Sequence, residues 1–179
     1  MFRCLKSGLS FSQSVEIDVP ADIVWETVAD LEALPRVVTM VTAYERVSGS
    51  PPVLGSRFRE TRLHRDREFT LLKTVTDVKD NQETEPVGQR WLSLGINFVN
   101  PNGSDVDTIN TSTLIVVRVD VKSSRLILTG AFQSGSCLDH LNNWCCYPCI
   151  KRLVSTSTAQ ELEDYRAAAM ERHQNRNHT

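Results

Sequence analysis

The chain lacks the features that mark several large classes of protein. No apolar run approaches the ~20 residues of a membrane-spanning helix, and the 20 basic and 22 acidic residues form no long run of either sign. A formal charge of −2 gives no sign of the basic footprint that a nucleic-acid partner requires. A glycine-rich phosphate loop, a zinc-protease His-Glu-x-x-His motif and a hydrolase Gly-x-Ser-x-Gly motif are also missing. The sequence therefore indicates no catalytic class by motif, no nucleic-acid partner and no cofactor.

Cysteine is too sparse and too irregularly spaced to indicate a disulfide framework. The chain has five cysteines, an odd number that includes one adjacent pair. Secreted disulfide-rich domains use even numbers, so we expect the cytoplasm or another reducing intracellular compartment. Residues 1–10 carry Arg3 and Lys6 but no apolar core of signal-peptide length. They are interpreted as a frayed end, with the remnant of a longer targeting segment as the alternative.

Length and composition predict a single domain. A chain of 179 residues can bury a real core and still leave a pocket. We place one domain at residues 11–172, with flexible termini at 1–10 and 173–179. No internal repeat, linker or low-complexity segment divides the sequence.

The first third of the chain has the clearest secondary-structure pattern. Apolar and polar residues alternate over Phe11–Asp18, which predicts a half-buried strand. Pro20 suits the first position of a helix that runs to Asp30, and Leu34-Pro35 begins a short second helix. The strands expected next are Ala43–Val47, Ser56–His64 and Glu68–Val78.

The rest of the chain predicts further strands and then a long helix. The strands expected here are Gln89–Val99, Thr111–Val121 and Arg125–Gln133, and Asn100–Asp107 is a loop by composition. From Cys137 or Leu138 to about Arg172 the period becomes helical, with Pro148 as a kink or restart. The apolar face of this helix contains Tyr147, Ile150, Val154, Thr158, Leu162, Tyr165 and Ala169. This order predicts an α+β domain in which a curved antiparallel sheet, closed by helices, encloses a cavity.

The residues from Val15 to Arg62 resemble a known family. The segments "VEIDVPADIVWETVADLEALPRVVTMVTAYERVSG" and "VLGSRFRETR" are similar to the polyketide cyclase/dehydrase and lipid-transport family of the START-like (SRPBCC) superfamily. The matching features are a proline at the helix start, the Val24-Trp25 pair, Asp30 before Leu34-Pro35, and the strand opened by Gly55. The spacing after Asp80 and the cysteine-rich start of the last helix depart from the family pattern.

This resemblance implies the helix-grip fold, with a cavity between sheet and helix. Members of the superfamily bind lipids, sterols, polyketides, quinones or plant hormones, and a minority are aromatases or cyclases. No fixed catalytic motif runs through the superfamily, so the fold alone does not predict an activity.

The strand Ser56–His64 contains the main candidates for polar contacts in the cavity. If Phe58 points inward, Glu60, Arg62 and His64 share its face, because side chains alternate along a strand. The opposite register would turn all three to solvent. The resemblance favours the first register, because it implies that the aromatic residue after the glycine faces the cavity. His64 lies near the hairpin tip, where we expect it to be solvated.

The predicted cavity lining combines this strand with residues from both helices. Arg118 interrupts an apolar run, and we expect it to point outward, since an inward guanidinium would need a carboxylate such as Glu60. Trp91 either lines the pocket or caps an edge. The predicted lining residues are Trp25, Val28, Phe58, Glu60, Arg62, Leu71, Trp91, Tyr147, Ile150 and Val154.

A cysteine cluster stands at the start of the last helix. Cys137, Cys145 and Cys149, with His140, are zinc-ligand types, but paired Cys-x-x-Cys knuckles are absent. We favour packing as small apolar residues and no metal, with a redox-sensitive or lipidated thiol and a metal site as alternatives. The aromatic residues beside the cluster also suit a transient membrane contact.

These observations predict a domain that binds a hydrophobic small molecule for transport, sequestration or presentation. One alternative is a cyclase, aromatase or dehydratase that uses Glu60 or His64 as acid or base. The other is an adaptor whose cavity is filled by side chains and which docks through Trp144–Ile150. Ligand identity and oligomeric state do not follow from the sequence.

Overall fold

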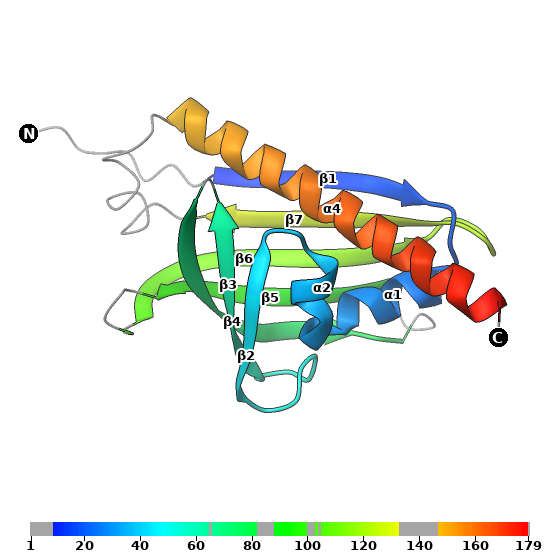
Figure 1. Cartoon of the computed structure of the whole chain (residues 1–179), viewed down its shortest axis with the longest axis horizontal. Coiled ribbons are helices and arrows are strands. Elements are labelled where there is room, and N and C mark those ends of the chain that lie inside the picture. The colour runs from blue at the N-terminus through cyan, green and yellow to red at the C-terminus, as the bar shows by residue number, and fades with distance from the viewer. Residues whose placement is uncertain are drawn as a thin grey trace, which may run out of the picture.

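The computed structural model describes residues 9–64, 66–81, 88–99, 103, 105–132 and 147–178, without the side chains of 105–109 and 147–150. These residues form a seven-stranded sheet and a long helix that crosses it (Figure 1). The strands are β1 (Leu9–Ile17), β2 (Val41–Ser48), β3 (Arg57–His64), β4 (Arg67–Lys79), β5 (Gln89–Val99), β6 (Asp105–Arg118) and β7 (Ser124–Phe132). The helices are α1 (Ala21–Ala29), the 3₁₀ turn η1 (Leu31–Ala33), α2 (Leu34–Val37) and α4 (Tyr147–Asn177).

The sheet is antiparallel throughout and strongly curved. Its strand order is β1-β7-β6-β5-β4-β3-β2, so β1 and β2 are the edges. The pairing registers shift between Val75 and Asp77 and between Ile96 and Phe98, and such bulges bend a sheet. In Figure 1 strands β2 to β4 run steeply across the direction of β1 and β7, while α4 lies along β1 and β7. The fold predicted from the sequence, an α+β helix-grip domain, is confirmed.

One face of the sheet carries the core, and we call it the inner face. Alternation along each strand sends every second side chain to this face, where α1 and α4 cover it. Pro20 stands just before α1, as expected for a residue that has no N–H to donate. The cluster of buried side chains includes Ile17, Val24, Val28, Phe58, Leu92, Val116, Leu126, Leu162, Tyr165 and Ala169. Burying each of the larger ones stabilises the fold by ~1.5–3 kcal/mol.

The structure corrects several predicted boundaries. Strand β1 begins at Leu9, so residues 9–10 belong to the sheet and not to a flexible terminus. Strand β6 begins at Asp105, inside the segment expected to be a loop. Helix α4 continues to Asn177 and does not end near Arg172, so residues 173–177 are not a flexible tail. Arg172 and Arg176 explain the extension, because they form ion pairs with Asp30 and Glu26, which hold the last turns of α4 against α1. The segment 137–146, expected to begin the helix, lies outside the described residues. Within the described part of the chain, no helix is long and apolar enough to span a membrane.

Candidate functional site

The inner face has two differently covered halves. Under α1 and the C-terminal half of α4, its side chains are fully buried, as Leu92 and Leu126 are at 0% exposure. Further along the same strands, inward-facing phenylalanines stay partly exposed: Phe69 at 36%, and Phe11, Phe98 and Phe132 at intermediate values. We call these four residues the aromatic end of the inner face. Large apolar side chains that face inward without full cover are the first indication of a site.

The aromatic end consists of two ring pairs on the inner face, separated from each other by strand β6. Phe11 of β1 stacks on Phe132 of β7 with centroids 5.7 Å apart, and Phe69 of β4 lies 6.2 Å from Phe98 of β5. Gly130 lets the first pair approach the sheet, because a Cβ at this position would lie 2.7 Å from the Phe11 ring. Strand β6 runs between the two pairs, and its Ser112 pairs with Gly130 and shares the inner face.

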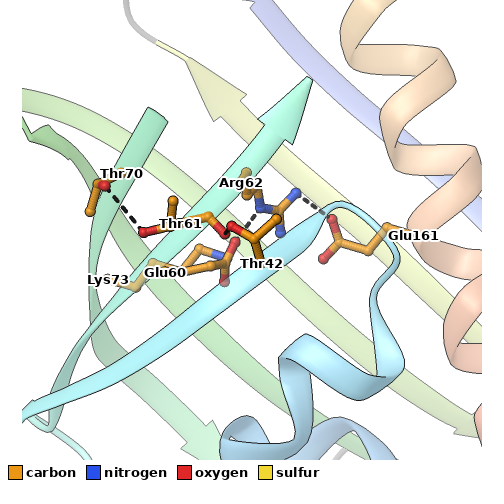
Figure 2. A network of polar contacts seen from close by, with 7 residues as sticks. All are labelled: Thr42, Glu60, Thr61, Arg62, Thr70, Lys73 and Glu161. Carbon is orange, nitrogen blue, oxygen red and sulfur yellow. Dashed lines mark hydrogen bonds and ion pairs between the residues drawn. The ribbon is translucent and has the colours of Figure 1, made fainter. Parts of the chain in front are cut away.

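Four charged side chains form a buried network next to this aromatic end (Figure 2). Glu60 of β3 accepts a hydrogen bond from Lys73 Nζ of β4 at 2.7 Å and another from Arg62 Nε. Arg62 Nη1 also donates to Glu161 Oε2 of α4 at 2.8 Å, which ties the sheet to the helix. None of the four side chains is more than 12% exposed, and Glu60 has no exposure at all. Two cations and two anions leave this quartet with no net charge.

Burial and neighbouring charges act in opposite directions on the pKa values of Glu60 and Arg62. Burial alone would raise the pKa of Glu60, but the charges of Lys73 and Arg62 outweigh it and lower this pKa from 4.5 to about 2. Burial would lower the pKa of Arg62, yet Glu161 and Glu60 raise it. Burial, followed by the Glu161 charge, raises the pKa of Tyr165 well above its usual value. Glu60 and Arg62 are therefore both ionised at neutral pH, and Glu60 is a poor proton acceptor there.

A pocket opens where β1 meets the N-terminal half of α4. Its volume is about 250 Å³, and Leu9 and Phe11 of β1 face Val154 of α4 across it. Gln13 bridges the two elements by donating to the Ser155 hydroxyl at 2.7 Å and to the Ser155 carbonyl at 3.1 Å. Phe11 thus belongs both to this pocket and to the aromatic end.

A comparison of the sequence with known protein families agrees with this fold. The family described as "Polyketide cyclase / dehydrase and lipid transport" matches residues 8–169. The chain belongs to this family. A search among curated proteins found no similar sequence.

Solved structures of low sequence identity share the fold of this family member. The Zhui aromatase/cyclase from Streptomyces sp. R1128 has a TM-score of 0.69 at 15% identity, over 93% of this chain and 96% of that one. A START superfamily protein from Mycobacterium smegmatis has a TM-score of 0.65 at 13% identity, over 90% and 97%. The ginseng major latex-like protein 151 from Panax ginseng has a TM-score of 0.63 at 8% identity, over 89% and 96%.

The structure brings the predicted polar residues of β3 together. Phe58 and Glu60 are fully buried on the inner face, and Arg62 reaches α4, so the register that turns these side chains inward is the observed one. His64 ends β3 near the hairpin tip, half-buried and four residues from Glu60. It has no place in the quartet, and Arg118, at the end of β6, is exposed.

The predicted apolar lining is spread over three places. Trp25 and Val28 pack in the core under α1, and Leu71 is buried on the inner face beside Glu60. Val154 lines the pocket at β1. Trp91 is corrected: it points to the outer face, because Leu92 next to it faces the core. There its indole N–H donates to Asp77 Oδ2 at 2.7 Å, and Lys79 Nζ lies 5.0 Å from the ring centroid.

Several predicted residues cannot be placed. Tyr147, Ile150 and Cys149 belong to α4, but their side chains are not among those described. Cys137, His140 and Cys145 lie outside the described residues altogether. Within the described part, no three His, Cys, Asp or Glu side chains gather in a way that could hold a metal ion.

Lys73, Glu161 and the aromatic end were not predicted from the sequence. Lys73 interrupts the apolar run of β4, and alternation puts it on the face of Leu71 and Val75, which was a usable signal. Glu161 lies four residues before Tyr165 on the apolar stripe of α4, where a carboxylate is out of place without a partner. The aromatic end had no local signal, because its rings come from four strands far apart in sequence.

Proposed function

We propose that the domain binds a hydrophobic small molecule against the aromatic end of the inner face, for transport, sequestration or presentation. The observation that supports this most directly is the contrast in burial along the inner face. The inward-facing side chains under α1 are buried, whereas those of the aromatic end remain partly exposed. The latter are Phe11, Phe69, Phe98 and Phe132. An apolar ligand would complete their burial at ~25 cal/mol per Å² of surface removed from water.

The quartet forms the polar border of this proposed site. Arg62 pairs across the strands with Phe69, and Glu60 pairs with Leu71, which in turn pairs with Phe98. The ion pairs hold these side chains in fixed positions, so they would orient a polar group of the ligand rather than move with it. Membership of a family described by both cyclase activity and lipid transport fits this proposal without choosing a ligand.

An acid–base role for Glu60 has less support. A general base works best with a pKa near the working pH, whereas the pKa of Glu60 is about 2 and both of its oxygens are held by cations. His64 stands apart from these groups at the end of β3. We therefore propose ligand binding, and not catalysis by this pair, as the function of the site.

A bulky side chain in the middle of the proposed site tests it. Ser112 faces the inner side between the two ring pairs, and Ser112→Trp would fill that space. Thr111→Trp adds a side chain of the same size to the neighbouring, exposed position on the outer face and serves as the matched control. We expect the uncharged dye Nile red to bind the wild-type protein with a saturable blue-shifted emission, and Ser112→Trp to weaken binding ~10-fold or more.

The comparison between the two variants decides the outcome. Thr111→Trp should bind the dye as the wild type does, because its indole cannot reach the inner face. Equal binding by both variants would place the dye elsewhere and remove the proposed site. Absence of saturable binding to the wild type would support the filled-cavity alternative.

A further inference from the structure

The pocket between β1 and α4 is too small to hold a typical ligand by itself. Its volume is about 250 Å³, whereas pockets that enclose drug-sized molecules span ~300–1,000 Å³. It is also partly open, so a molecule seated in it would extend either into solvent or into the protein. The residues that line its inner end therefore decide whether a bound molecule can extend into the protein.

Phe11 lines the pocket and is also a member of the aromatic end. The ring lies directly over Gly130 of β7, as the 2.7 Å approach to a Cβ at this position shows, and stacks on Phe132. A molecule seated in the pocket that extends past this ring would follow a path from solvent to the rest of the aromatic end.

The cover of this path includes residues 151–157 of α4, which contribute no buried side chain. Towards its C-terminal end, α4 is held by buried Leu162, Tyr165 and Ala169 and by the ion pair of Glu161 with Arg62. Further along, Arg172 bonds to Asp30. Between residues 151 and 157 every described side chain is exposed or half-exposed, and the hydrogen bonds from Gln13 to Ser155 fasten this half to β1.

The charge at the rim indicates which molecules would use this path. Among the described residues that line the pocket, Lys151 alone is charged, and it lies on the same side of α4 as Val154 and Ser155, three and four residues on. The quartet inside has no net charge and its cations are already paired, so it offers no place for an additional anion. An anionic group would remain at the rim, where water also solvates it.

We propose that this pocket is the entrance to the ligand site, and that the ligand is an amphipathic molecule with one anionic group. Lys151 holds that group at the rim, and the apolar chain passes Phe11 to reach the aromatic end. The proposal rests on the proposed function and specifies its ligand class and the direction of binding.

Two probes that differ only in charge test this proposal. The fluorescent fatty acid cis-parinaric acid carries a carboxylate, and its methyl ester has the same chain without the charge. We expect Lys151→Glu to weaken binding of the acid by roughly 3- to 10-fold at low ionic strength, with a smaller effect in high salt. Lys151→Gln should give an intermediate effect, and the methyl ester should bind all three proteins alike.

Arg152→Glu is the matched control, because it makes the same change of charge at the next, exposed position of α4, which does not line the pocket. Loss of acid binding in Lys151→Glu but not in Arg152→Glu supports the entrance. Equal losses in the two variants, or equal losses for acid and ester, would overturn it and leave the proposed function intact. Failure of both probes to bind the wild-type protein would overturn the proposed function as well.

Discussion

Glu60 is a carboxylate without contact with water, and its partners decide what its burial costs. Moving an isolated ion into the interior costs several kcal/mol, so a buried charge is stable only when it is paired and hydrogen-bonded. Lys73 and Arg62 supply that pairing, and Glu161 balances the second charge of the cations. Removing one member therefore leaves another buried charge unpaired, so the stability of each of the four residues depends on the other three.

The first prediction concerns the stability of this quartet. Glu60→Gln keeps the shape of the side chain but leaves the Lys73 ammonium buried without a counter-charge, so we expect a loss of ~3–5 kcal/mol in the free energy of unfolding. The double variant Glu60→Gln/Lys73→Met should be less destabilised than the single one. Urea unfolding of both proteins measures this.

Glu45→Gln is the control for this experiment. Glu45 on the neighbouring strand β2 pairs with Arg59 at 3.4 Å, but both side chains are exposed, so its loss should cost less than ~1 kcal/mol. If Glu60→Gln were no more destabilising than Glu45→Gln, the buried quartet would not exist as described.

The second prediction concerns acid stability. The pKa of Glu60 is about 2 in the folded protein and roughly 4.3 in the unfolded chain, so the unfolded chain binds the proton first as the pH falls. The stabilisation is complete above the unfolded pKa and is lost as the pH drops towards about 2, with a total of about 3 kcal/mol. Unfolding free energies from pH ~5 to ~2.5 should fall more steeply for the wild type than for Glu60→Gln/Lys73→Met. Parallel curves would show that Glu60 titrates normally.

For single residues, the sequence predicted on which face of a strand a charged side chain lies, but not which residues it contacts. Alternation around Phe58 was enough to turn Glu60 and Arg62 inward, because a strand has only two faces. Lys73 and Glu161 reach the quartet through sheet pairing and helix packing, which no local pattern contains. Trp91 was misplaced for the same reason, since a half-exposed aromatic residue suits either face of a strand.

Among the secondary-structure elements, α4 differs along its length in how many side chains it buries against the rest of the protein. Its C-terminal half contributes Leu162, Tyr165 and Ala169 to the core, while residues 151–157 contribute no buried side chain. Opening free energies in proteins follow such differences, because a segment with few buried contacts unfolds locally at low cost.

The third prediction therefore concerns the dynamics of α4. Backbone amides of residues 151–157 should exchange with deuterium at least ~10-fold faster than those of residues 161–169, because local opening exposes little apolar surface in the first segment. Hydrogen exchange followed by mass spectrometry or NMR measures the ratio. Uniform protection along the helix would mean that α4 is held equally at both ends and would remove the mobile cover over the pocket.

The elements themselves were largely predictable, and their ends were not. Strand β5 runs from Gln89 to Val99, as its composition predicts. Strand β6 starts earlier than expected because the polar residues after Asp105 pair with β5, and pairing outweighs composition. Helix α4 continues beyond its apolar stripe because Arg172 and Arg176 form ion pairs with Asp30 and Glu26 at α1.

For the molecule as a whole, the central feature is a curved sheet whose inner face is only partly filled by helices. Helix α1 and the C-terminal half of α4 seal one half of that face, and the quartet marks the boundary. The aromatic end beyond this boundary is the part that the sequence could not reveal, because only the order of the strands places Phe11 beside Phe132 and Phe69 beside Phe98 on one face. The fold, in contrast, followed from the sequence of strands and helices along the chain.

The most direct test of this account is native mass spectrometry of the wild-type protein after gentle purification from the cells that express it. We expect a population of molecules heavier than the bare chain by the mass of one lipid-sized compound, which acid unfolding releases. The Ser112→Trp protein should lack that population, and Thr111→Trp should retain it. A wild-type protein that shows only the mass of its own chain, and that gains no mass when incubated with long-chain amphipathic molecules, would contradict the central claim.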